Sequence, residues 1–171
     1  ETDPIRQINF VLSSVADKIR YMGDWRSIDG AYIPRSLAKI SKTHFGDCKD
    51  LATLTAKLLR ILGYEADVGW VFRGKVLPIT TDFGYLNFNH AVVSVKLRDK
   101  QLWLDATNFQ SYAQGVFEDI GERRALLMNP KRLEFRSIEF SPSRENREVT
   151  EELTSLNSKN ERHNFVKVDD T

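Results

Sequence analysis

The sequence predicts an α+β domain in which helices come first and an antiparallel β-sheet follows. Three observations support this prediction. The first third of the chain has apolar residues at helical spacing, residues 66–140 contain strand-like runs, and turn-forming residues separate those runs. Helices followed by strands are typical of an α+β fold, whereas alternating strands and helices would indicate a parallel sheet.

The composition is that of an ordinary globular chain. The 171 residues are 41% hydrophobic and 29% charged, and the formal net charge is +1. This balance gives no support to nucleic-acid binding, and no apolar run is long enough to span a membrane. A single cysteine excludes an internal disulfide framework and a cysteine-rich zinc site, so we expect neither a metal nor a cofactor.

We expect a folded domain over residues 1–140 and a polar extension over residues 141–171. The extension contains only six aliphatic or aromatic residues against seven acidic and five basic ones. Such a segment is typical of a solvated or partly disordered tail, or of the start of a following domain. The chain begins at Glu1 and has no signal peptide, so we expect a piece of a longer multidomain protein of unknown compartment.

Two helices are expected before the cysteine. Asp3 is an N-cap residue and Pro4 suits the first helical turn, and an apolar stripe then predicts a helix to about Arg20. Residues 21–33 have the composition of a loop. Residues 34–42 predict a short second helix.

The best helical pattern in the chain begins at the only cysteine. Leucines recur at helical spacing from Leu51 to Leu62, and Gly63 is a stop signal. Asp47 is a good N-cap residue, which places Cys48 in the first turn. Unpaired N–H groups and the helix dipole favour an anion there. We therefore expect the thiolate to be stabilised and the sulfur to be nucleophilic near neutral pH.

Strand-like runs follow the cysteine helix. The predicted strands are residues 66–72, 90–97, 101–107, 126–128 and 133–140. Residues 98–100 form the turn of the central hairpin. The loop over residues 77–89 is rich in aromatic residues, and it would either wall a substrate cleft or plug the core over the sheet; both interpretations stay open.

A cysteine, a histidine and an aspartate each lie at the edge of a predicted element. Cys48 opens the helix, His90 begins a strand, and Asp105 lies near the end of the next strand. This order outlines a thiol nucleophile, its base and the residue that orients the base. Each residue alone has a plainer structural explanation, but three coincidences in one domain favour a catalytic site. His44 precedes the helix and His163 lies in the polar extension, so both are weaker candidates for the base.

The spacing of His90 and Asp105 poses a geometric difficulty, although both face the same side of the predicted hairpin. A two-residue turn at positions 99–100 would place His90 opposite Phe109. Asp105 would then lie about 13 Å away at ~3.3 Å per residue. A larger loop that begins near Lys96 would bring the two residues opposite each other.

These residues resemble the motifs of a known family. The run Gly46-Asp47-Cys48-Lys49-Asp50 and its leucine-rich helix resemble the transglutaminase-like superfamily, most closely a bacterial subgroup with this GDCKD signature. Asn89-His90-Ala91 and Trp103-Leu104-Asp105-Ala106-Thr107 match the second and third motifs in order. The resemblance covers about residues 20–130. It implies a papain-like core, with the cysteine helix packed on an antiparallel sheet that carries the histidine and the aspartate.

The resemblance implies acyl transfer through a thioester. Cys48 would attack a carboxamide or peptide carbonyl. His90 would accept the thiol proton and later protonate the leaving amine, while Asp105 would hold the imidazole tautomer. Matching order also implies that Trp25 donates to the oxyanion, with Tyr21 as the second choice.

Other features of the resemblance bear on the acyl acceptor. Asn89 would line the site beside the histidine. Lys49 follows the cysteine where animal cross-linking enzymes usually have tryptophan, and no calcium-binding cluster of carboxylates is visible. An exposed Lys49 would also repel a protonated lysine acceptor, by about 1 kcal/mol at ~4 Å. Hydrolysis is therefore expected over cross-linking, and the resemblance suggests the periplasm or cell envelope.

We expect a transglutaminase-like cysteine peptidase or amidase that acts on a peptide or protein substrate. Two alternatives stay open. A catalytically idle module would keep the fold and bind peptide or protein partners, although it would not need all three residues. A papain-type or cell-wall amidase of another thiol family would have a polar residue other than Asp105 beside His90.

Overall fold

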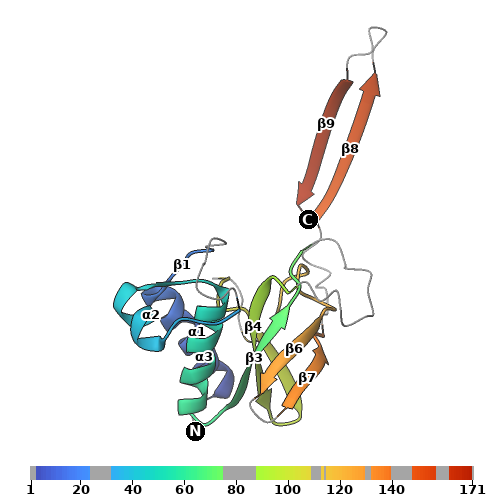
Figure 1. Cartoon of the computed structure of the whole chain (residues 1–171). Coiled ribbons are helices and arrows are strands. Elements are labelled where there is room, and N and C mark those ends of the chain that lie inside the picture. Colours follow the sequence, from blue (N-terminus) through green and yellow to red (C-terminus); the bar gives the residue numbers. More distant parts are fainter. Residues whose placement is uncertain are drawn as a thin grey trace. The chain divides into compact units, whose positions relative to one another are not determined.

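The computed structural model describes residues 3–23, 32–74, 88–108, 113, 115–129, 132–139, 148–156 and 162–170 (Figure 1). The chain forms two compact units, Glu1–Phe140 and Ser141–Thr171, and each is described by itself. The first unit packs helices against a curled antiparallel sheet, so the predicted α+β class is confirmed. The second unit contains a pair of antiparallel strands.

The helices of the first unit are α1 (Pro4–Lys18), α2 (Leu37–Thr43) and α3 (Cys48–Ile61). α1 begins where the sequence predicts, because the Asp3 carboxylate accepts a hydrogen bond from the backbone N of Ile5 at 3.0 Å. α2 begins later than predicted, because Ser36 is its N-cap. Asp47 caps α3, so the prediction that Cys48 opens this helix is confirmed.

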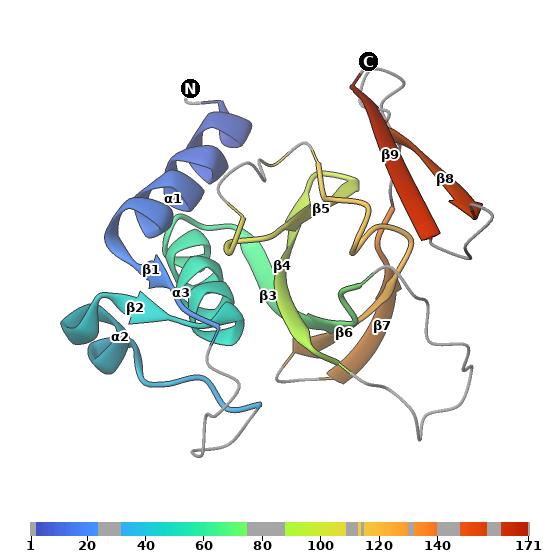
Figure 2. The same cartoon turned by 90° about the horizontal axis from the view of Figure 1, so that it is seen from above.

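The sheet strands are β3 (Glu65–Val71), β4 (His90–Leu97), β5 (Lys100–Leu104), β6 (Arg124–Asn129) and β7 (Arg132–Ser137). They lie in the order β5-β4-β3-β6-β7, and every neighbouring pair is antiparallel. α3 packs on β3 and β4, and α1 packs on α3 (Figure 2). The cysteine helix therefore covers the centre of the sheet.

Both faces of the central strands are buried. Ile8, Leu59 and Val93 belong to the main core between the helices and the sheet. Val92 and Ile120 belong to a second, smaller core on the other face. Because neighbouring residues of β4 face different cores, its sequence is nearly continuous in apolar residues rather than strictly alternating.

A short parallel pair of strands was not predicted. β1 (Arg20–Tyr21) pairs with β2 (Phe45–Gly46), so that Tyr21 lies opposite Gly46. The backbone N of Met22 donates to the Gly46 carbonyl at 2.8 Å. This pairing ties the end of α1 to the segment that leads into α3.

The hairpin between β4 and β5 has a tight turn. Leu97 pairs with Lys100, and the turn residue Arg98 has a φ of 56°. The turn therefore lies one residue earlier than the two-residue turn considered from the sequence. The larger loop considered near Lys96 does not form, because Lys96 itself pairs with Gln101.

The second unit consists of β8 (Glu148–Leu156) paired with β9 (Arg162–Asp170). The sequence predicts a solvated or partly disordered tail, or the start of a following domain, over residues 141–171, and this segment is too polar to show a clear apolar alternation. Within the described parts of the chain, no helix is both long and apolar enough to cross a membrane.

Gly46 offers a test of the packing that leads into the cysteine helix. A Cβ on Gly46 would lie 2.7 Å from Cδ1 of Leu51 and 3.0 Å from Cβ of Asp50. We expect Gly46→Ala to lower the free energy of unfolding by about 1–3 kcal/mol in urea titrations, because α3 must shift. Gly115→Ala is the control, since nothing lies within 4 Å of its Cβ position. Equal stability of both variants would contradict this packing.

Candidate active site

The start of α3 is built by two reciprocal hydrogen bonds. The backbone N of Asp50 donates to Oδ1 of Asp47 at 3.2 Å, and the backbone N of Asp47 donates to Oδ2 of Asp50 at 3.2 Å. This capping box satisfies two N–H groups that a helix start otherwise leaves unpaired. Cys48, the first residue of the helix, is half-buried in that turn.

Asp50 anchors this turn to the segment before α2. Its side chain is completely buried, and its two oxygens accept hydrogen bonds from the backbone N and Nε of Arg35, both at 2.8 Å. Arg35 also donates to the Phe45 carbonyl at 2.9 Å. The buried carboxylate is thus paired and hydrogen-bonded, as a buried charge must be.

Lys49 is part of the same structure and is not a free cation near the sulfur. Its residue exposure is 5%, and its ammonium forms an ion pair with Asp47. Repulsion of a protonated amine by Lys49 required an exposed side chain. Lys49 therefore gives no support to hydrolysis over transfer to an amine.

His90 and Asp105 are joined by a buried hydrogen bond between Nε2 and Oδ2, 3.0 Å apart. Their exposures are 2% and 1%. β5 ends at Leu104, opposite Val93, so Asp105 follows the strand and lies diagonally across from His90. Side chains can bridge such a diagonal, and no larger loop is needed.

Further contacts fix the Asp105 carboxylate. Its Oδ1 accepts hydrogen bonds from the backbone N of Thr107 at 2.9 Å and from the Thr107 hydroxyl at 2.7 Å. Burial opposes ionisation of Asp105, but the hydrogen bond and charge of His90, together with Thr107, outweigh it and lower the pKa of Asp105. The carboxylate is therefore ionised at neutral pH.

The same contacts favour the protonated form of His90. Burial alone would lower its pKa, but hydrogen bonds with Asp105 and Cys48 raise the pKa of His90 to about 9. Because Nε2 is occupied by Asp105, Nδ1 is the ring nitrogen left for the thiol. The site thus favours an imidazolium beside the sulfur at neutral pH.

The structure also places other residues expected near the site. The pairing of β1 with β2 brings Tyr21 close to Cys48, and burial followed by the charges of Cys48 and Asp105 raises the pKa of the Tyr21 hydroxyl. Tyr21 therefore remains a hydrogen-bond donor. Trp25 lies outside the described residues, as does most of the 77–89 loop. His44 is exposed and contacts the Lys18 carbonyl through Nδ1 at 3.3 Å.

The side chain of Asn89, which is expected to line the site, binds the backbone of Arg73. Its Oδ1 accepts from the backbone N of Arg73 at 2.6 Å, and its Nδ2 donates to the Arg73 carbonyl at 2.9 Å. Both polar atoms of the amide are used in this bracket, which joins the end of β3 to the start of β4.

Arg73 lies at the site, although the sequence does not single it out. It follows β3, and its guanidinium reaches both Asp105 and Asp119. No local sequence signal identifies it, because its partners lie far away in the chain. No group of three potential metal ligands is present among the described residues.

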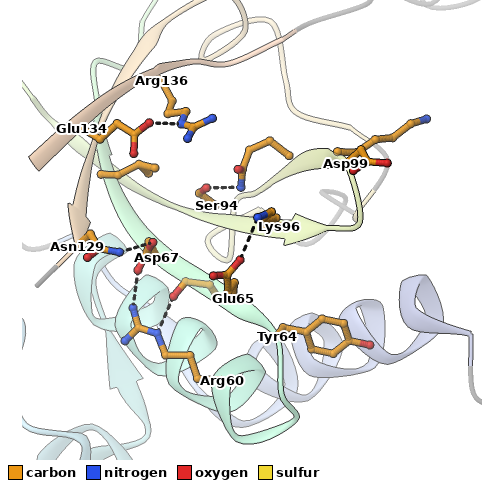
Figure 3. Close-up of a pocket in the computed structure, with 14 residues that line it drawn as sticks. Arg60, Tyr64, Glu65, Asp67, Ser94, Lys96, Asp99, Asn129, Glu134 and Arg136 are labelled. Atoms are coloured by element: carbon orange, nitrogen blue, oxygen red, sulfur yellow. Dashed lines mark hydrogen bonds and ion pairs between the residues drawn. The ribbon is translucent and has the colours of Figure 1, made fainter. Parts of the chain in front are cut away.

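A separate pocket of about 610 Å³ lies at the other end of the sheet strands (Figure 3). It is lined near the start of β3 and the end of β4, whereas His90 pairs with the last residue of β3. The charges in this pocket largely pair with one another, as Arg60 does with Asp67 at 3.0 Å and Arg136 with Glu134 at 2.6 Å. It contains no nucleophilic cysteine and is distinct from the Cys48 site.

The shifted pKa of His90 predicts how stability depends on pH. A folded-state pKa of about 9, raised from 6.5, gives a stabilising contribution that is complete below pH 6.5 and lost as pH rises through about 9. We expect the free energy of unfolding to fall more steeply between pH 7 and 10 in the wild type than in His90→Gln, as measured by urea titration. Parallel pH profiles would contradict the raised pKa.

Comparisons with known proteins give a likeness of fold. No protein-family model matches the sequence, and no curated protein matches it significantly. The structure is similar to the crystal structure of a proposed protease from Parabacteroides distasonis, with a TM-score of 0.58 and 13% sequence identity. The similarity covers 84% of this chain and 26% of that protein, so the chain spans about a quarter of its length. At this identity the comparison establishes a shared fold.

Proposed function

We propose that this domain is a transglutaminase-like thiol hydrolase with a papain-like core, acting on peptide or carboxamide bonds. The observation that carries the proposal is the buried hydrogen bond between His90 and Asp105, with Cys48 as the second partner of the imidazole. A thiol, a base and an orienting carboxylate are the groups that nucleophilic catalysis at a carbonyl requires. The shared fold with a proposed protease supports a hydrolytic role.

In the proposed mechanism, the proton of the Cys48 thiol already rests on Nδ1 of His90, as the raised pKa of the imidazole favours, and the thiolate attacks the carbonyl carbon. The tetrahedral intermediate collapses by breaking the C–N bond, and the leaving amine takes its proton from His90. Water then attacks the thioester, with His90 accepting a water proton, and the acid is released as the thiol re-forms. Asp105 holds the imidazole in the required tautomer throughout.

The developing oxyanion needs donors beside the sulfur. The backbone N–H of Cys48 lies in the first turn of α3, where N–H groups lack helical partners. Tyr21 is the second donor in this proposal, because its hydroxyl stays protonated and it interacts electrostatically with Cys48. Trp25, the first choice from the sequence, stays a prediction.

Water is the proposed acceptor, and a single assay compares it with an amine. Peptides prepared from a proteome are incubated with the protein and a fluorescent primary amine, and mass spectrometry records new termini, deamidated side chains and amine adducts. We expect hydrolysis products to exceed amine adducts. Adducts in excess would indicate transglutamination, and no Cys48-dependent product would favour the idle binding module.

Two variants test whether the products are formed at the proposed site. Cys48→Ala should abolish turnover, and Asp105→Asn should reduce it by roughly 10²- to 10⁴-fold, because the imidazole loses its preferred tautomer. Asp67→Asn is the matched control, since Asp67 lies in the separate pocket at the other end of β3. Full turnover in Asp105→Asn would remove this carboxylate from the mechanism.

A further inference from the structure

Arg73 is held firmly beside the proposed active site. The side chain of Asn89 forms hydrogen bonds with both the backbone N and the carbonyl of Arg73, between β3 and β4. Its guanidinium bridges two carboxylates, with Nε 2.6 Å from Oδ2 of Asp119 and Nη1 3.5 Å from Oδ2 of Asp105. The Asp105 oxygen in this contact is the one that also bonds His90.

We propose that Arg73 is a positioning residue that acts on His90 through the shared Oδ2 of Asp105. Its positive charge weakens the stabilisation that this carboxylate gives to protonated His90. The inference rests on the proposed function for its effect on turnover. Its effect on His90 titration can be measured without any substrate.

The physical reason is competition between two cations for one carboxylate. Nη1 of Arg73 and Nε2 of His90 lie 3.5 and 3.0 Å from the same oxygen, so they are at most about 6.5 Å apart. A guanidinium at this distance opposes a second positive charge on the imidazole. An acid that holds its proton less strongly protonates the leaving amine more readily.

Holding Asp105 in place does not by itself require Arg73. The backbone N and the hydroxyl of Thr107 already bind Oδ1, and His90 binds Oδ2. His90 interacts with Cys48 at the start of α3 and with Asp105 after β5, and Arg73 joins Asp105 to Asp119. Tyr21 on β1 interacts electrostatically with Cys48, Arg73, Asp105 and Asp47. Arg73 is the cation of this group that contacts the Asp105 carboxylate.

Substitutions of Arg73 and of its partner Asp119 should shift the titration midpoint of His90 in opposite directions. The His90 ring is titrated by NMR in the full chain with Cys48→Ala, which removes the coupled thiol, and its signal is assigned by loss in His90→Gln. Adding Arg73→Gln removes a cation, so the His90 midpoint should rise by about 0.5 pH unit or more. Adding Asp119→Asn leaves Arg73 less neutralised, so the midpoint should fall.

Arg73→Lys keeps the charge and should stay closer to the parent protein than Arg73→Gln does. Thermal melting checks that each variant folds. If Arg73→Gln does not fold, the Asp119→Asn and Arg73→Lys variants still test the proposal. Unchanged midpoints, or shifts of the same sign in Arg73→Gln and Asp119→Asn, would overturn the proposal, because a purely structural role predicts no opposite shifts.

Turnover separates this inference from the proposed function. In an otherwise wild-type chain, Arg73→Gln should lower kcat with little change in KM. A raised KM with an unshifted His90 midpoint would instead make Arg73 a substrate-binding residue and overturn the inference. If the midpoints shift as expected but no Cys48-dependent hydrolysis is found, the Arg73 inference stands and the proposed function fails.

Discussion

The capping box at the start of α3 is the constraint on which the site depends. Asp47 and Asp50 bind each other's backbone N–H groups, and this fixes the residue at which the helix begins. Because Cys48 is that first residue, the same bonds set the position of the thiol. Asp50 is also the buried partner of Arg35, so the same carboxylate that caps the helix ties this turn to the segment before α2.

Most of the GDCKD run therefore builds structure around the sulfur of the proposed nucleophile. Gly46 allows the close approach of Leu51, Asp47 caps the helix, and Lys49 pairs with that cap. Asp50 ties the turn to the preceding segment. In the proposed mechanism, Cys48 is the residue of this run whose side chain attacks the carbonyl.

Local features were predictable from the sequence, because neighbouring residues determine them. The cap at Asp47, the helix from Cys48 and the strand from His90 all follow from residue type and spacing, and the structure confirms these elements. The meeting of His90 and Asp105 was less secure. The turn that sets their register moved by one residue, and a diagonal contact replaced direct pairing. Arg73 and the parallel pairing of Tyr21 with Gly46 could not be predicted, since their partners are distant in sequence.

If His90 activates Cys48 as a nucleophile, the thiol should be alkylated faster than an ordinary thiol. Reaction with iodoacetamide at pH 6.5 is followed by intact-mass spectrometry, with N-acetylcysteine as the reference thiol. We expect Cys48 to react about tenfold faster than the reference, His90→Gln to remove this advantage, and Cys48→Ala to give no adduct. A wild-type rate no faster than that of the reference thiol, or an equal rate in His90→Gln, would show that His90 does not activate Cys48.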